Sequence, residues 1–188
     1  MRRSPILSAS LVALVLATAG VLLLSGGSSA QPSKSQQLFR QSLLDDAKTT
    51  TAIKDLLRER GGFVAPEVQF SDLTGDDRSD AVVSVDTAGA AGRVAIYVFS
   101  TDGKAEDSPL RAVYRSQRLY RASTEIRDSQ LILRVPRYTE GDDLCCPAKT
   151  VVRVYSWSSK RQRFQRRSSR EVDGSPGPAR TAASPSSG

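Results

Sequence analysis

The spacing of apolar residues changes near Val64, and this change limits the fold more than any other feature of the chain. From there on, apolar residues alternate with polar ones in short runs bounded by Gly, Asp and Ser. Alternation with a period of two is typical of half-buried β-strands. We therefore expect strands over residues 67–70, 80–86, 93–100, 110–117, 121–127, 130–136, 150–158 and 163–168.

The connections between the expected strands are short turns, such as Asp102-Gly103 and Asp128-Ser129, without helical stretches between them. Parallel strands need long crossovers, so these strands are expected to form a meandering antiparallel sheet. The run from Val94 to Phe99 is continuously apolar, which predicts a central strand covered on both faces. Arginines that interleave with apolar residues on flanking strands are expected to line one solvated face: Arg111, Arg115, Arg121, Arg127 and Arg134.

Apolar residues at helical spacing precede the strands. After a polar linker over residues 31–36, the apolar pattern predicts a helix over about residues 35–48. The threonines at 49–51 offer a break and an N-cap before a second apolar stripe, and Gly61-Gly62 is a natural helix end. Two helices or one kinked helix would fit, lying over the sheet as a lid. The predicted fold class is α+β, with N-terminal helices packed on a meandering antiparallel β-sheet.

The start of the chain has the pattern of an export signal. Arg2 and Arg3 precede an apolar run over residues 6–24, and Ser28-Ser29-Ala30 precedes Gln31. We expect cleavage after Ala30 and a secreted or cell-envelope protein, the alternative being an uncleaved membrane anchor. The expected organisation is a signal at 1–30, a linker and first helix at 31–49, an α+β domain at 50–170 and a disordered tail at 171–188.

The composition excludes several kinds of catalytic site. The 188 residues contain no histidine, which removes Ser-His-Asp and Cys-His nucleophiles and histidine metal sites. The chain also offers neither a phosphate-binding glycine loop nor a cofactor fingerprint. We therefore expect no catalytic residues and a function other than that of an enzyme.

The stretch from Asp72 to Asp80 is rich in aspartate. Oxygen-bearing side chains at alternate positions around a sharp turn are the ligands that calcium requires, and the expected set is Asp72, Thr74, Asp76, the Arg78 carbonyl and Asp80. The stretch resembles the loop of FG-GAP and VCBS-type repeats of secreted proteins, except that Thr74 and Asp77 depart from that pattern. The first expectation is nevertheless a tight turn in which Asp72 and Asp76 accept hydrogen bonds from nearby backbone N–H groups, with calcium binding as the alternative.

The two cysteines, Cys145 and Cys146, are adjacent. Export favours oxidation, which leaves a bond between them, two free thiols or bonds to another chain. Consecutive Cα atoms lie about 3.8 Å apart, below the roughly 4.4 to 6.8 Å usual for disulfides, so a ring between them would be strained and easily reduced. Such a ring would act as a redox switch or as a rigid element before the strand at 150–158.

Basic residues cluster around Phe164: Lys160, Arg161, Arg163, Arg166, Arg167 and Arg170. They are expected to meet an anionic wall polymer or lipid headgroups, or to protect an edge strand from pairing with other chains. Without Arg2 and Arg3 the chain keeps 25 basic residues against 20 acidic ones. This small excess is far below that of a dedicated nucleic-acid binder, so we expect no nucleic-acid partner.

Several short motifs together resemble a known family. The stretch 72–76, the strand 93–99, Tyr138, Cys145-Cys146-Pro147 and Tyr155-Ser156-Trp157 are similar to the LppP/LprE-like lipoproteins of actinobacteria, although the lipidation cysteine is absent. The resemblance implies a non-enzymatic cell-envelope domain. We expect it to bind an envelope protein or ligand, the alternatives being a calcium-dependent binding module through Asp72–Asp80 and a redox-responsive protein through Cys145-Cys146.

Overall fold

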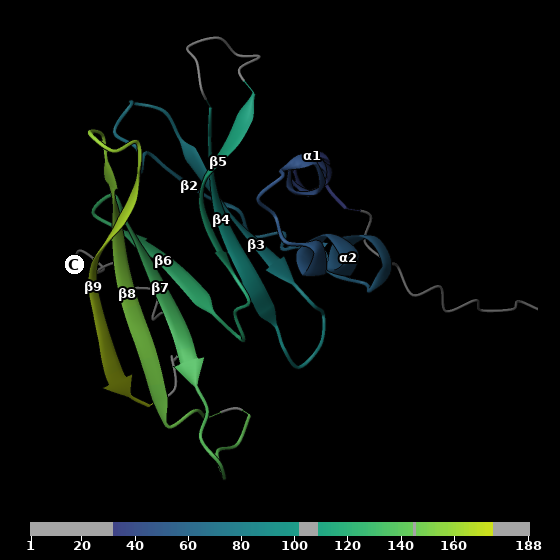
Figure 1. The fold of residues 1–188 in the computed structure, drawn as a ribbon, viewed down its shortest axis with the longest axis vertical. Coiled ribbons are helices and arrows are strands. Elements are labelled where there is room, and N and C mark those ends of the chain that lie inside the picture. Colours follow the sequence, from purple (N-terminus) through teal and green to yellow (C-terminus); the bar gives the residue numbers. More distant parts are fainter. Residues whose placement is uncertain (1–31, 102–108, 145, 175–188) are drawn as a thin grey trace, which may run out of the picture. The chain divides into compact units, whose positions relative to one another are not determined.

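The computed structural model describes residues 32–101, 109–144 and 146–174. The predicted export signal at 1–30, the turn at Asp102-Gly103, Cys145 and the predicted tail from 175 onward lie outside the described residues. Within them, two short helices precede nine strands in two antiparallel sheets (Figure 1).

The helices are α1 (Lys34–Asp45) and α2 (Thr51–Glu59), which confirms two helices rather than one kinked helix. A capping box starts α1, in which the Ser33 side chain accepts from the Gln36 N–H and the Gln36 side chain accepts from the Ser33 N–H. Thr50 is the N-cap of α2, and the left-handed Gly61 (φ 69°) follows its C-terminal end. No helix in the described ranges is long and apolar enough to cross a bilayer.

The first sheet holds β1 (Phe63–Val64), β2 (Gln69–Ser71), β3 (Asp80–Asp86), β4 (Arg93–Thr101) and β5 (Leu110–Gln117). Its order is β1-β3-β4-β5, and β2 also pairs with β3. The second sheet holds β6 (Ser123–Arg127), β7 (Gln130–Arg137), β8 (Lys149–Ser158) and β9 (Arg163–Asp173) in chain order. Both sheets are antiparallel, as predicted.

Two apolar layers hold these elements together. Val83, Tyr97 and Phe99 point from one face of the first sheet toward the helices, where they pack with Phe39 and Leu43. The alternate residues of the same strands, including Val82, Ile96 and Val98, point toward the second sheet and pack with Leu131 and Leu133. The first sheet is therefore covered on both faces, as the continuous apolar run of β4 predicted.

The predicted α+β class, with helices on one meandering sheet, is wrong. The described chain is mostly β-structure in two sheets, and the helices have only 12 and 9 residues. The sheets separate at residues 118–122, where Arg118 (φ 62°) and Arg121 (φ 49°) are left-handed and the backbone bonds back to β4. Alternation identifies strands but does not show whether consecutive strands pair, so the division was not visible in the pattern.

Candidate functional site

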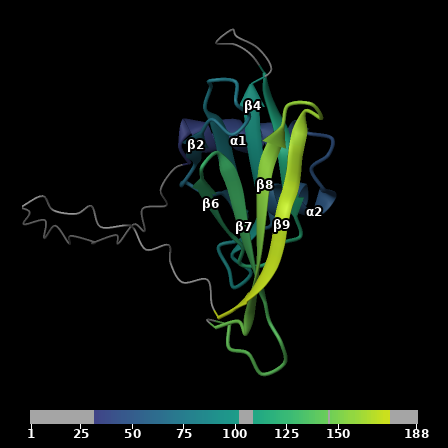
Figure 2. The same cartoon turned by 90° about the vertical axis from the view of Figure 1, so that its left-hand side faces the viewer.

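The second sheet has one face that nothing covers among the described residues. Its inner face packs on the first sheet, and the helices lie on the far side of that first sheet (Figure 1). The outer face is turned to the viewer in Figure 2, where β6 to β9 lie side by side. A broad sheet face open to solvent is a surface available for a partner.

The strand register shows which side chains occupy this outer face, because directly paired residues project to the same side of a sheet. Leu131 and Leu133 point into the core, so Ile132 and Arg134 point outward. Arg134 pairs with Val152, and Val152 pairs with Arg170 on β9. Extending the alternation along all four strands places the following arginines outward: Arg127, Arg134, Arg163, Arg167 and Arg170.

We call this set the arginine face. A bulge between Ser168 and Arg166 makes Arg167 the extra residue of β9, and its Nε donates to Ser156 Oγ at 2.5 Å, on the outer side. Among the described strand residues only Glu125 adds an acidic side chain to the face. Five positive charges therefore stand against one negative charge.

Glu125 lies between two of these arginines. Its Oε2 atom accepts from the Arg134 side chain at 2.6 Å, and its Oε1 atom is paired with Arg127. The hydrogen bond from Arg134 holds the pKa of Glu125 below its ordinary value, so the carboxylate stays charged. Glu125 keeps the two guanidinium groups at fixed positions on β6 and β7.

The arginine side chains also cover the sheet. Val152 is only 3% exposed and Ile132 only 7% exposed, although both are on the face that no described element covers. Their neighbours must therefore lie over them, and the long stems of arginines such as Arg134 are suited to this while their guanidinium groups stay in water. The face is a layer of guanidinium groups above a floor of small apolar side chains.

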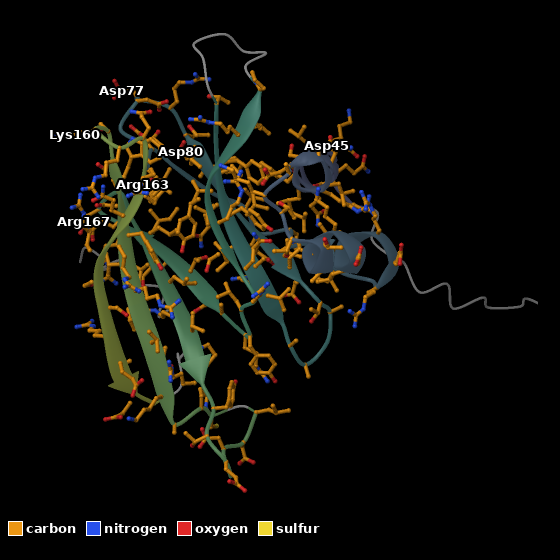
Figure 3. The ribbon with its side chains drawn as sticks, in the orientation of Figure 1. Asp45, Asp77, Asp80, Lys160, Arg163 and Arg167 are labelled. Atoms are coloured by element: carbon orange, nitrogen blue, oxygen red, sulfur yellow. The ribbon has the colours of Figure 1, made fainter. Side chains whose placement is uncertain are left out.

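The structure divides the cluster predicted around Phe164. Arg163 and Arg167 belong to the arginine face, whereas Lys160 and Arg161 lie in the turn between β8 and β9 (Figure 3). Arg166 pairs with Tyr155, whose ring packs against the inner core. The Arg166 side chain therefore projects from the inner face of the second sheet, opposite to the arginine face. Arg170 of the same predicted cluster is also on the arginine face, and the register adds Arg127 and Arg134 to it.

The prediction that five arginines on flanking strands line one solvated face is wrong for three of them, whereas Arg127 and Arg134 do share the arginine face. Arg111 and Arg115 are on β5 of the first sheet, and Arg121 is in the link between the sheets. Arg115 lies beside Tyr97 on the helix side, where its Nε donates to Asp46 Oδ2 at 2.6 Å. The sequence contained a signal for part of the arginine face. The two-residue turn at Asp128-Ser129 sets the register between β6 and β7, and this register places Arg127 and Arg134 on the same side of the sheet.

The aspartate-rich loop between β2 and β3 is held by its own carboxylates. Asp72 accepts from the N–H groups of Gly75 (2.6 Å) and Asp77 (3.0 Å). Asp80 is 1% exposed and accepts from the N–H groups of Leu73 (2.8 Å) and Thr74 (2.9 Å). These are the bonds of a tight side-chain-stabilised turn.

The expected calcium ligands belong to this loop, where most of them bond to its backbone. Besides the bonds of Asp72 and Asp80, the Thr74 hydroxyl is 3.4 Å from Asp80 Oδ1, and Asp76 accepts from the Arg78 N–H at 3.1 Å. In the described ranges no group of three or more His, Cys, Asp or Glu side chains is arranged to hold a metal. Calcium binding stays a prediction, tested below.

The loop between β7 and β8 carries the cysteines. Its shape depends on Asp142, which accepts from the N–H groups of Thr139 (2.8 Å) and Ala148 (2.9 Å). These backbone hydrogen bonds, that from Ala148 first, hold the pKa of Asp142 below its ordinary value. Cys145 lies outside the described residues, so its bond to Cys146 stays a prediction, and the described part of the chain holds no free cysteine.

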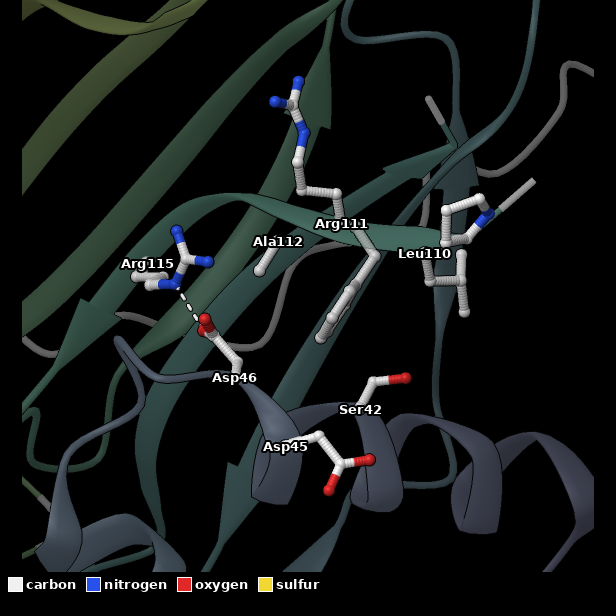
Figure 4. A pocket seen from close by; sticks show the side chains of 9 residues that line it. Ser42, Asp45, Asp46, Leu110, Arg111, Ala112 and Arg115 are labelled. Carbon is white, nitrogen blue, oxygen red and sulfur yellow. Dashed lines mark hydrogen bonds and ion pairs between the residues drawn. The ribbon is translucent and has the colours of Figure 1, made fainter. Parts of the chain in front are cut away.

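A pocket of about 400 Å³ lies between the end of α1 and β5 (Figure 4). Phe99 and Ala112 contribute to its lining, and Asp46 is bonded to Arg115 at its side. Burial raises the pKa of Asp46, but the hydrogen bonds from Arg115 and from the Lys48 N–H outweigh it and lower the pKa overall. The ion pair joins the helices to the sheet, so we interpret it as part of the packing.

Comparison with known proteins gives one similarity. The chain is 31% identical over 118 residues to the lipoprotein CseA of Streptomyces avermitilis, an alignment that covers 62% of this chain and 52% of the relative. The chain thus spans about half the length of the curated relative it matches. No family model and no solved structure matches the chain. The chain is therefore similar to an actinobacterial lipoprotein, in line with the broader part of the sequence resemblance.

Proposed function

We propose that this protein is an exported, non-catalytic domain of the cell envelope that binds an anionic envelope component through the arginine face. The observation that carries the proposal is the outer face of the second sheet, which no described element covers and whose described strand residues include five arginines and one glutamate. The expected export signal and the similarity to a Streptomyces lipoprotein support the location. Closer relatives are expected among the LppP/LprE-like lipoproteins, whose short motifs the chain resembles.

The position of Arg134 favours binding over the plainer explanation. Charged side chains on edge strands discourage strands of other molecules from pairing, and this accounts for arginines on β6 and β9. Arg134 is on β7, which has β6 on one side and β8 on the other, and it therefore protects no edge. The outward arginines of β6 and β7 face those of β9 across the short outward side chains of β8, and together they make this face positive.

A charge-reversal variant of the full chain tests the proposal. Arg163→Glu, Arg167→Glu and Arg170→Glu together reverse β9, whose three side chains are exposed. The matched control reverses three exposed cations near the helices, Lys48→Glu, Arg58→Glu and Arg60→Glu, with the same change in net charge. Binding is measured to a poly(glycerol phosphate) chain, to polyglutamate and to vesicles containing phosphatidylglycerol, at low and high salt.

We expect the wild-type chain and the helix control to bind at least one of these polyanions, with an affinity that falls as salt rises. The β9 variant should bind at least about tenfold more weakly, and its affinity should depend less on salt, because fewer counterions are released. Wild-type protein that binds none of the three probes contradicts the proposed function. Equal losses in the two variants also contradict it, since net charge alone would then account for the effect.

A further inference from the structure

We infer that the anionic component is a linear phosphodiester polymer, which lies along β8 between the arginines of β7 and β9. This inference rests on the proposed function and names the ligand class. Arg134 and Arg170 flank Val152 from the two neighbouring strands. Neighbouring strands lie about 4.8 Å apart, so the two backbones are about 10 Å apart. Both side chains are long enough to reach an anion above β8, provided that the Arg134 guanidinium turns from Glu125 on β6 toward β8.

The cations continue along the direction of β8. Arg167 reaches over to Ser156 Oγ, four residues beyond Val152. At about 3.3 Å per residue, this second cationic position lies roughly 13 Å from the first. Between them the outward side chains of β8 are Val152, Val154 and Ser156, which are short. A chain with regularly spaced charges and neutral linkers matches this row, because its charges meet arginines while its linkers lie over small side chains.

The kind of cation favours an oxyanion, and the placement of the arginines favours phosphate. The basic residues at the described outward positions of β6 to β9 are arginines, without a lysine. A guanidinium group offers a planar fork of N–H donors that binds the oxygens of phosphate or carboxylate in pairs, whereas an ammonium group acts as a point charge. A tetrahedral phosphate accepts from Arg134 and Arg170 on opposite sides of β8 at the same time.

The distribution of exposed apolar residues favours a polymer in solution over a bilayer. Peripheral membrane proteins commonly combine basic residues with apolar side chains that enter the acyl region. The large exposed apolar side chains of the described ranges are Leu38, Phe63, Phe70 and Leu144, and none of them is on β6 to β9. The arginine face thus presents charge without an apolar anchor.

The test compares probes and a charge-conserving variant of the full chain. Poly(glycerol phosphate), polyglutamate with the same number of charges and phosphatidylglycerol vesicles are titrated against wild type, Arg134→Lys/Arg170→Lys and the control Arg58→Lys/Arg60→Lys. The Lys variant keeps every positive charge but loses both guanidinium forks. We expect wild type to bind poly(glycerol phosphate) at least about tenfold more tightly than the other probes, the Lys variant to lose most of that preference, and the control to keep it.

The outcomes separate this inference from the proposed function. Polyglutamate or vesicles bound as well as poly(glycerol phosphate) would overturn the phosphodiester inference and leave the proposed function standing. A Lys variant that keeps the full preference overturns the assignment to Arg134 and Arg170. No binding of any probe by wild type contradicts both. Arg170→Lys alone, at an exposed position of β9, must show a smaller loss in the same direction, and its thermal transition reports on folding.

Discussion

At the scale of single residues, Asp80 stands out as the charged side chain that is almost fully buried among the described residues. Its Oδ2 atom accepts from two backbone N–H groups, those of Leu73 and Thr74. Asp80→Ala leaves the buried Leu73 donor and the half-buried Thr74 donor without this partner, so the free energy of unfolding should fall by about 3 kcal/mol. Urea denaturation measures the loss. The control is Asp77→Asn, whose free energy of unfolding should stay within about 0.5 kcal/mol of wild type, because asparagine tolerates the left-handed backbone at this position (φ 62°). A stable Asp80→Ala variant would show that the loop does not depend on these bonds.

A calcium titration tests whether the same loop binds a metal ion. Because Asp72 and Asp80 already accept backbone hydrogen bonds, we expect the melting temperature of the chelator-treated full chain to stay constant as calcium is added. A calcium-binding module predicts the opposite, a melting temperature that rises with calcium by mass action. Differential scanning calorimetry with magnesium as the parallel titration distinguishes the two. A rise specific to calcium would establish the metal site predicted from Asp72, Thr74, Asp76 and Asp80.

The state of the cysteines is a further prediction at this scale. An exported chain with a bond between Cys145 and Cys146 should resist alkylation until a reductant is added. Intact-mass measurement of the native protein, alkylated before and after reduction, counts the reactive thiols. Alkylation of both cysteines without reductant would contradict the bond, and reversible closure near physiological potentials would support the redox-responsive alternative.

At the scale of elements, the link between α1 and α2 depends on the pair Asp46–Arg115. The pKa of Asp46 is lowered in the folded state, so the pair stabilises the fold above the ordinary pKa of 3.8 and is lost as the pH falls through the lower folded value. Asp46→Asn should cost about 2 kcal/mol at neutral pH. The difference between wild type and variant should vanish below the folded pKa, as measured by urea denaturation over a pH series. A difference that is constant with pH would contradict this role.

The same scale shows what the sequence predicts and where it fails. Every predicted strand appears, because alternating apolar residues and short turns are local signals. The two-residue strand β1 was missed, and β9 continues past its predicted end to Asp173, since Arg and Ser offer no apolar pattern there. Which strands pair across the chain depends on long-range packing. For this reason the sequence predicted Arg134 on a solvated face and Arg163 and Arg167 in a separate basic cluster, and only the register shows that they share one face.

At the scale of the whole molecule, the first sheet contributes side chains to both apolar layers. We therefore expect the two layers to unfold cooperatively. Leu57, on α2, packs in the layer between the helices and the first sheet. Leu133, on β7, packs in the layer between the two sheets, and both side chains are nearly fully buried. Leu57→Ala and Leu133→Ala should each cost about 2–5 kcal/mol. Because β3 and β4 contribute side chains to both layers, loss of either layer should destabilise the other, and each variant should unfold in a single transition.

Calorimetry and hydrogen exchange check this expectation in the full chain. The calorimetric and van't Hoff enthalpies should agree for wild type and for both variants. Amide protons of β4 and β8 should exchange through the same global opening. Each substitution should therefore lower the protection of β4 and of β8 by the same amount. If Leu57→Ala instead released the helices while β8 kept its protection, the helical layer would be an independent unit. The arginine face would then depend on the two sheets alone, and binding of poly(glycerol phosphate) by Leu57→Ala would persist after the helices had melted.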